Sequence, residues 1–307
     1  RRPPRSTLSS SSAASDVYKR QGLNCFKCVH RLDGPPSFCP HSLTITDGKE
    51  HIAEVHEDNL GGDFWVSTTP LFDLHGQIIG SIHVARDITE RKRMQQELFD
   101  TLEASQRRQS EVSALLKASK AVLQHRKFKN AARLIFNSCK GLLGATAGYV
   151  ALLNEDTMRN DVVYLDSGGL PCTVDPSLPM PIRGLRAEAY ITEKAIYDND
   201  FSNSNWVKLM PEGHMSLKNV LFAPLTIDNK TVGLIGVANK PEGFTEHDAK
   251  MALSFGQLAS IALNNSRMLE SLKENENKLK EYNERLEDLV EEKTKQLKGA
   301  EKLATIG

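Results

Sequence analysis

Five cysteine and histidine side chains gather near the start of the chain. They follow the spacing C-x2-C-x-H-x8-C-x-H, at Cys25, Cys28, His30, Cys39 and His41. Thiolates and imidazoles this close together can hold zinc or an iron–sulfur cluster, and neighbouring thiols can form a redox-switchable pair. The pattern makes these residues a candidate metal or redox site, although reduced thiols beside half-buried histidines are the interpretation that we favour. His30 comes one residue too late for the C-x-x-C-H attachment of a c-type haem.

Three segments after the cluster have the pattern of short β-strands. Residues 49–55 alternate weakly, residues 64–71 are rich in β-branched and aromatic side chains, and residues 76–86 alternate after a turn at residues 73–76. Alternation of polar and apolar residues indicates strands with one buried face. We expect these segments to be the last three strands of a small antiparallel sheet.

Residues 87–125 contain no proline or glycine and carry a heptad pattern. Steps of four and three residues connect a seam made of Leu98, Leu102, Ser105, Gln109, Val112, Leu116, Ser119 and Leu123. Such a seam is typical of helices that pair along their length, although polar residues weaken this one. We expect a parallel two-helix coil, and the alternative is one amphipathic helix packed on a neighbouring domain.

A stronger heptad pattern occupies residues 269–307. Its seam consists of Leu272, Asn275, Leu279, Tyr282, Leu286, Leu289, Lys293, Gln296, Ala300 and Leu303. Asn275 and Lys293 in the seam cost stability but favour one register and a two-stranded state. The two seams together predict a homodimer held by parallel coiled coils, in which the helices convey motion along their axis.

Between the heptad stretches, helical and strand patterns alternate. Helices are predicted at residues 128–143, 184–192 and 246–266, and strands at residues 148–154, 161–166, 219–227 and 231–239. Thr245 is placed to cap the last helix, and a tight turn at residues 228–230 joins the last two strands. This order predicts an α+β domain with its helices gathered on one side of the sheet.

Residues 80–98, GSIHVARDITERKRMQQEL, resemble the end of a PAS domain and its C-terminal PAC motif. In that family an Asp-Ile-Thr triplet joins the last strand to the output helix, which implies a capping and signal-transmission role for Asp87 and Thr89. A plain helix cap is the alternative. The cysteine segment also resembles a PAS loop in which Cys28 is an extra residue. The resemblance implies a truncated PAS domain at residues 22–93 and a signalling helix at residues 94–126.

Residues 219–263 resemble the second half of a GAF domain. The run APL…G…GV…NK…F…D carries the likeness, at Ala223, Pro224, Leu225, Gly233, Gly236, Val237, Asn239, Lys240, Phe244 and Asp248. It implies a complete GAF domain at residues 127–268 that responds to a small molecule or redox signal. Asn239, Lys240, Phe244 and Asp248 also occur in cyclic-nucleotide GAF domains, but Ala249 departs from that pattern. Because these residues recur in GAF domains that bind no nucleotide, the ligand stays open.

The last seven residues, EKLATIG, resemble the opening of the dimerisation and phosphoacceptor domain of a sensor histidine kinase. After a PAS end and a GAF domain, this implies the sensory input region of a two-component kinase, with a coiled coil at residues 269–300 and the kinase beginning at residues 301–307. The phosphoacceptor histidine, ATP and the response regulator belong to the kinase core, so no catalytic residue is expected here. The alternatives are the sensory region of a diguanylate cyclase or of a non-enzymatic GAF-regulated transcription factor.

The first 21 residues alter the charge balance. Residues 11–21, SSAASDVYKRQ, resemble a translated sequencing adapter, so we expect residues 1–21 to be a non-native, disordered leader; a genuine serine-rich leader is the alternative. Without them, the chain holds 34 basic residues (39 less five) and 38 acidic residues (39 less one). This balance argues against a nucleic-acid partner. No apolar run approaches the roughly 18 residues of a membrane span, and we expect a cytoplasmic protein.

Overall fold

The computed structural model describes residues 22, 24–175 and 178–304, and it does not describe the side chains of residues 28 and 295–304. The leader predicted at residues 1–21 and the last three residues of the predicted kinase opening lie outside this description. The chain divides into two compact units between Ser105 and Gln106. In the described ranges, no helix is both long enough and apolar enough to cross a membrane.

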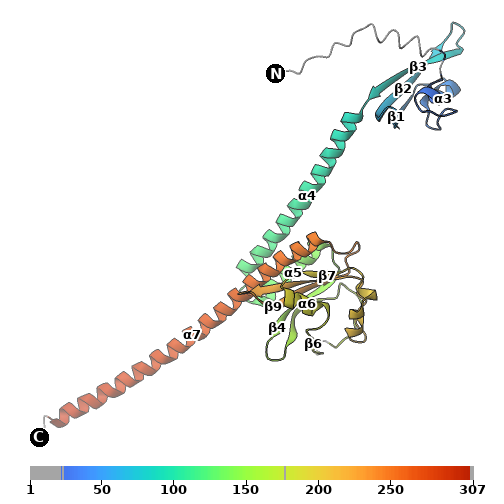
Figure 1. Cartoon of the computed structure of the whole chain (residues 1–307). Coiled ribbons are helices and arrows are strands. Elements are labelled where there is room, and N and C mark those ends of the chain that lie inside the picture. The colour runs from blue at the N-terminus through green and yellow to red at the C-terminus, as the bar shows by residue number, and fades with distance from the viewer. Residues whose placement is uncertain (1–21, 23, 176–177, 305–307) are drawn as a thin grey trace. The chain divides into compact units, whose positions relative to one another are not determined.

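The first unit is built on a three-stranded antiparallel sheet (Figure 1). Its elements are α2 (Cys25–Cys28), α3 (Pro40–Asp47), β1 (His51–Glu57), β2 (Gly62–Phe72), β3 (Ile78–Asp87) and the first part of α4 (Thr89–Gln124). The order β1-β2-β3 confirms the three predicted strands, with small shifts at their ends. Asp73 closes the β2–β3 turn, because its Oδ1 accepts the backbone N–H groups of His75 and Gln77, both at 2.8 Å.

The second unit holds a six-stranded sheet in the order β6-β5-β4-β9-β8-β7, in which every neighbouring pair is antiparallel. Its further elements are α5 (Phe128–Leu143), β4 (Ala147–Asn154), β5 (Arg159–Asp166), β6 (Met180–Pro181), α6 (Leu185–Thr192), β7 (Ile196–Asp198), η1 (Phe201–Asn203), η2 (Asn205–Leu209), β8 (Val220–Ile227), β9 (Lys230–Ala238) and α7 (Glu246–Ala304). The predicted helices and strands are present. The short β6, β7, η1 and η2 carry no periodic signal and were not predicted.

Strand β8 shows how the large sheet separates two layers. Leu221, Ala223 and Leu225 point into a core formed with α5, α7 and the last part of α4. Val220 and Phe222 point to the opposite face, into a second cluster formed with α6 and the 3-10 turns. This strict alternation follows from the two-residue period of a strand. Burial of each large apolar side chain stabilises the fold by about 1.5–3 kcal/mol.

The expectation that all helices lie on one side of the sheet is wrong for α6. Its buried residues Leu185 and Ala189 are four apart, so they form one apolar stripe. That stripe packs in the second cluster, on the face opposite α5 and α7. A helical pattern shows that a helix has a buried face, but it does not show which side of the sheet receives it.

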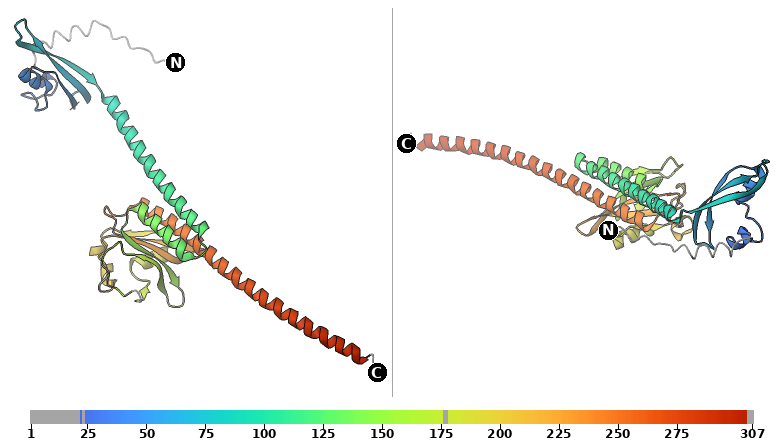
Figure 2. Two further views of the ribbon diagram at one scale, coloured as in Figure 1. Left: turned by 180° about the vertical axis from the view of Figure 1, so that it is seen from behind. Right: turned by 90° about the horizontal axis from the view of Figure 1, so that it is seen from above.

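Helix α7 is one continuous helix from Glu246 to Ala304, so the two helical segments predicted separately are joined (Figure 2). Its first part packs on the sheet, and the remainder continues past it. Five apolar side chains of the predicted seam are 51–63% exposed in the single chain: Leu272, Leu279, Tyr282, Leu286 and Leu289. Seam pairing between two chains stays a prediction.

Helix α4 has two separate apolar stripes. Ala118, Ala121 and Val122 are buried in the core of the second unit, which bears out packing on a domain for this part of the helix. The seam residues Leu116 and Leu123 lie elsewhere on its circumference and are 55% and 84% exposed. Packing on the domain therefore leaves the predicted seam unused.

Helix α7 approaches β8 most closely at Gly256. A Cβ atom at this position would lie 2.4 Å from the carbonyl oxygen of Pro224, well inside van der Waals contact. Glycine is unfavourable within a helix, so its use here indicates that the close approach outweighs helix propensity. The absence of a side chain at residue 256 allows α7 to approach β8 this closely.

Replacing this glycine tests the close approach. We expect Gly256→Ala to lower the free energy of unfolding by about 1–3 kcal/mol, because overpacking outweighs the roughly 1 kcal/mol that alanine gains in a helix. Gly141 in α5 is the matched control, since no atom lies within 4 Å of the place where its Cβ would be. Gly141→Ala should stabilise by up to about 1 kcal/mol. Equal stabilisation at both positions in urea denaturation would contradict the packing argument.

Candidate ligand-binding site

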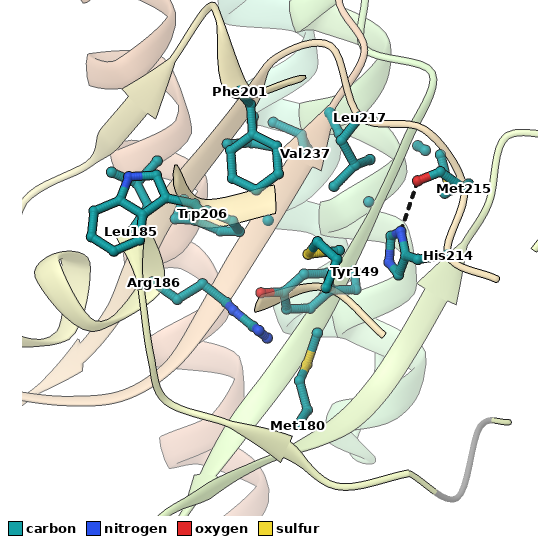
Figure 3. A pocket seen from close by; sticks show the side chains of 18 of the residues that line it. Tyr149, Met180, Leu185, Arg186, Phe201, Trp206, His214, Met215, Leu217 and Val237 are labelled. Atoms are coloured by element: carbon teal, nitrogen blue, oxygen red, sulfur yellow. Dashed lines mark hydrogen bonds between the residues drawn. The ribbon is translucent and has the colours of Figure 1, made fainter. Parts of the chain in front are cut away.

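A cavity of about 110 Å³ lies on the face of the large sheet that α6 covers (Figure 3). Strands β4, β9 and β8 form its floor, and its walls come from α6, η1, η2 and the segment that precedes β8. Apolar side chains dominate the lining, among them Met180, Phe201, Trp206, Leu217 and Phe222. A concave, mostly apolar space with a few polar groups is the usual form of a small-molecule site.

A glycine in β9 makes room for the aromatic floor of the cavity. Tyr149 in β4 pairs with Gly236 in β9, and a Cβ at Gly236 would lie 2.8 Å from the Tyr149 ring. The ring therefore lies across the bare backbone of β9. Tyr149 is 9% exposed, and Figure 3 shows its hydroxyl end directed towards Arg186.

Three of the five polar side chains in the lining already have hydrogen-bond partners. Asp166 accepts from Lys140 Nζ at 2.5 Å, Arg183 donates to the Leu209 carbonyl at 2.6 Å, and His214 Nδ1 donates to the Met215 carbonyl at 2.8 Å. The Lys140 hydrogen bond, followed by the Gly168 N–H, holds the pKa of Asp166 below its usual range. Asp166 is therefore an ion-paired carboxylate at neutral pH.

The other two polar side chains, Tyr149 and Arg186, present buried atoms without a partner. By hydrogen-bond geometry, neither the Tyr149 hydroxyl nor Arg186 Nη1 has a partner among the described residues, although the Arg186 guanidinium lies close enough to the phenol to oppose the rise of its pKa. One turn along α6 from Arg186, Tyr190 donates its hydroxyl proton to Asn160 Oδ1. Nδ2 of Asn160 is also unpaired among the described atoms. This corner of the domain thus has more hydrogen-bond donors than acceptors.

Both tyrosines keep their protons at neutral pH. Burial raises the pKa of Tyr149, and the positive charge of Arg186 opposes that effect only in part. Burial also raises the pKa of Tyr190, and Tyr149 adds to the shift. A protonated phenol can donate a hydrogen bond, so the Tyr149 hydroxyl and the Arg186 guanidinium are both available as donors.

The predicted GAF-motif residues meet beside the cavity rather than in its lining. Asp248 is 7% exposed, and its Oδ2 accepts from Lys240 Nζ at 2.6 Å and from the Thr245 N–H at 2.8 Å. Thr245 Oγ1 in turn accepts the Asp248 N–H at 3.2 Å. This reciprocal pair is a capping box, which confirms Thr245 as the cap of α7.

Asn239 and Phe244 extend this network, which we call the clasp (Asn239, Lys240, Phe244 and Asp248). The Asn239 side chain accepts the Lys218 N–H at 2.8 Å and adopts a left-handed φ of 59° that asparagine tolerates. The backbone of Phe244 is held by both atoms of the Asn199 side-chain amide, at 2.6 and 2.8 Å. The clasp fastens the end of β9 and the start of α7 to neighbouring segments.

Asp87 and Thr89 lie at the junction where β3 ends and α4 begins. Asp87 Oδ1 accepts the Thr89 N–H at 2.9 Å, and Thr89 Oγ1 accepts the Asp63 N–H at 2.9 Å. Gly62 leaves space for this hydroxyl, because a Cβ there would lie 2.4 Å from Thr89 Oγ1. The pair ties the first turn of α4 to the start of β2, and its role in signal transmission stays a prediction.

The cysteine–histidine cluster is spread over several contacts. Cys25, His30 and Cys39 line a cavity of about 190 Å³ in the first unit, where His30 pairs with Glu57. His41 instead hydrogen-bonds Ser81 Oγ at 2.7 Å. Among the described residues, no three His, Cys, Asp or Glu side chains are grouped so that they can hold a metal ion. The Cys28 side chain lies outside the described part, and the metal or redox site stays a prediction.

Sequence reasoning did not single out Tyr149 or Arg186. The available signal was weak: Arg186 and Tyr190 are four residues apart in LRAEAYIT and directly follow the buried positions Leu185 and Ala189. This spacing places both polar side chains at the edge of the buried stripe of α6. Their convergence with Tyr149 depends on the docking of α6 over β4, which is a tertiary contact.

The clasp makes a testable contribution to stability. Burial raises the pKa of Asp248, but hydrogen bonds from Lys240 and Thr245 outweigh it, so the pKa lies below its ordinary value. A depressed folded-state pKa stabilises the fold above the unfolded-state pKa of about 4, and this contribution disappears as the pH falls through the folded-state value. We expect Asp248→Asn to cost about 1–3 kcal/mol at pH 7 and to reduce the loss of stability as the pH falls below about 5.

Asp228→Asn is the matched control for this prediction. Asp228 is an exposed residue of the β8–β9 turn with a φ of 49°, a conformation that asparagine also adopts. It should change stability by less than about 0.5 kcal/mol. Denaturation curves at several pH values measure both variants. The clasp argument is wrong if Asp248→Asn keeps the wild-type pH dependence.

Comparison with known proteins identifies part of the chain. Residues 125–264 match the family model of the GAF domain. The chain is 27% identical over 218 residues to the methyl sulfide methyltransferase-associated sensor of Methanosarcina acetivorans, a match that covers 69% of this chain and 21% of that protein. The chain thus spans about a fifth of the length of this curated relative.

Solved GAF domains give similar matches. The GAF domain of an Acinetobacter phosphoenolpyruvate-protein phosphotransferase is 16% identical, with a TM-score of 0.45, over 51% of this chain and 94% of that one. Its counterpart from Coxiella burnetii is 15% identical, with a TM-score of 0.47, over 53% and 98%. The family match by itself identifies residues 125–264 as a GAF domain.

Proposed function

We propose that this chain is the sensory input region of a sensor histidine kinase in a two-component system. The GAF domain binds a small molecule in the cavity of the large sheet, and α7 carries the effect of binding towards a kinase core. Residues 22–93 act in the same proposal as the C-terminal part of a PAS domain. Three features of the sequence support the proposal as a whole: the Asp-Ile-Thr junction, the EKLATIG ending and the likeness to a distant relative named as a sensor.

One observation carries the proposal: β8 lies between the cavity and the output helix. Phe222 lines the cavity, while Ala223 and Leu225 belong to the core on the α7 side. Gly256 brings α7 close to the backbone of Pro224 in the same strand. A ligand that moves Phe222 therefore acts on a strand that α7 contacts directly.

The part of α7 that continues past the sheet can carry the effect of ligand binding out of the GAF domain. Closely packed elements move as rigid bodies, so a small shift at β8 displaces the whole helix. In a parallel dimer, two such helices can change their relative rotation or register. A ligand shifts this equilibrium only if it binds one of the two arrangements more tightly than the other.

Fusions that keep or break the heptad register of α7 test whether ligand binding changes the activity of an attached kinase. The chain is fused through the heptad register of α7 to a histidine kinase catalytic region, and a panel of small alcohols, amides and carboxylates is screened for a compound that binds. We expect that compound to change autophosphorylation. Seven residues inserted after Glu276 should preserve the response, because they keep the heptad phase, whereas four inserted residues should abolish or invert it.

The proposal fails if a compound bound to the GAF domain leaves autophosphorylation unchanged in every fusion. Where the gene continues past residue 307, its coding sequence separates the alternatives. A histidine followed by acidic and Asn-Pro residues supports the kinase, Gly-Gly-Asp/Glu-Glu-Phe supports a diguanylate cyclase, and a helix-turn-helix supports a transcription factor.

Dimer formation through the α7 seam is a separate prediction. Leu279 is 62% exposed in the single chain and occupies a seam position. We expect Leu279→Lys to weaken a wild-type dimer at least tenfold, because it places a charge in each helix at an apolar interface. Asn277 lies outside the seam, so Asn277→Lys should leave the dimer unchanged. Analytical ultracentrifugation measures both, and a wild-type monomer at high micromolar concentration would refute the seam.

A further inference from the structure

We propose that the GAF cavity binds a small organic carboxylate whose apolar body enters the pocket and whose anionic group meets Arg186 and Tyr149. This inference rests on the proposed sensory function and names the class of ligand. The observation behind it is the juxtaposition of two donor groups, each with a buried atom that lacks a geometric hydrogen-bond partner among the described residues, in a mostly apolar wall (Figure 3).

Arg186 is the first part of the argument. Its side chain is partly buried and its Nη1 atom is fully covered without a hydrogen-bond partner among the described residues. No carboxylate in the described part of the chain forms an ion pair with it. A guanidinium is a permanently charged donor group in proteins. Covering this charge without an anion is unfavourable.

Tyr149 is the second part, and it comes from a different element. The side chain is nine-tenths buried, and its hydroxyl faces the cavity wall that contains Arg186 (Figure 3). The raised pKa keeps the proton on the phenol, so it offers a donor rather than a second charge. Two donors from β4 and α6 therefore converge on one point.

The remaining polar groups of the cavity do not compete for that point. Asp166 is paired with Lys140, and Arg183 is exposed and donates to the Leu209 carbonyl. The ring of His214 is held by the Met215 carbonyl. Arg186 and Tyr149 thus leave the wall with unsatisfied donors and a positive charge, which favours an anionic acceptor.

The planar fork of arginine matches the two oxygens of a carboxylate, and a phenol can add a third hydrogen bond. The rest of the ligand meets apolar and aromatic side chains, including Phe201, Trp206 and Phe222. Met180, Met210 and Met215 are adaptable side chains that can adjust to its shape. A cavity of about 110 Å³ is slightly smaller than one of about 150 Å³ that holds benzene, so the apolar body must be small.

Calorimetric titration of the full chain tests the proposal with butyrate, hexanoate and benzoate. Butyramide, hexanamide and benzamide are the matched neutral probes, since they keep the shape and remove the charge. We expect at least one carboxylate to bind ten or more times as tightly as its amide. Arg186→Gln should weaken that carboxylate at least tenfold, equivalent to about 1.4 kcal/mol. Tyr149→Phe should weaken it about tenfold or more, because a hydrogen bond to a carboxylate is charge-assisted.

Arg133 provides the control for loss of one positive charge. It is an exposed residue of α5 outside the cavity lining, so Arg133→Gln should bind the carboxylate as the wild type does. Thermal unfolding of the ligand-free variants distinguishes a ligand-binding arginine from one that stabilises the fold. Arg186→Met should raise the melting temperature, because it removes a covered charge that has no partner. A structural arginine would instead give a lower melting temperature.

Two outcomes overturn the inference: carboxylates that bind no more tightly than their amides, or an Arg186→Gln chain with wild-type carboxylate affinity. The amide comparison uses only the wild-type chain, so it holds even if a variant does not fold. Binding of neutral probes without a preference for carboxylates rejects the anion and leaves the sensory proposal standing. Carboxylate binding that never alters a fused kinase rejects the sensory proposal and leaves the ligand class standing.

Discussion

Helix α7 lies so close to strand β8 that only a glycine fits between them at residue 256. This contact determines how the GAF domain can respond to anything inside it. A strand that faces a cavity through Phe222 and a helix through Leu225 cannot shift on one side alone, because protein interiors are close-packed. The clasp adds a second fixed point at the start of α7, where Asp248 binds both Lys240 and Thr245. Between these two points the helix has little freedom to slide independently of the sheet.

The clasp and the pair formed by Tyr149 and Arg186 are two groups of polar residues with different roles. The clasp satisfies its members with hydrogen bonds of normal length, and it lies outside the cavity lining, so it behaves as a structural fastening. Tyr149 and Arg186 lie inside the lining and lack partners among the described atoms. Most buried polar groups of a fold have hydrogen-bond partners, so two buried groups without partners are best explained where a ligand supplies the missing hydrogen bonds. In our proposal, the motif residues of the GAF domain fasten the segments around the site, and the less conspicuous Tyr149 and Arg186 meet the ligand.

The sequence predicted those features that depend on neighbours along the chain. Thr245 directly precedes a helical pattern, and a tight turn was predicted at residues 228–230, where Asp228 and Asn229 adopt the left-handed conformation, so both features could be inferred. The side of the sheet that α6 covers could not, because an amphipathic pattern has no direction in space. For the same reason, the meeting of Arg186 with Tyr149 was invisible. Cys25 and His41 are close in sequence, yet the fold gives them different neighbours.

An unpaired guanidinium also suits a protein that has to change state. In the ligand-free domain, a positive charge covered without an anion disfavours the arrangement in which α6 lies against the sheet, relative to one in which Arg186 would reach water. A bound carboxylate removes that cost and favours the arrangement in which α6 lies against the sheet. The ligand then has different affinities for the two arrangements, which is the requirement for any shift in population. Because α6 contacts β8 from the face opposite α7, the charge that selects the ligand also has a path to the output helix.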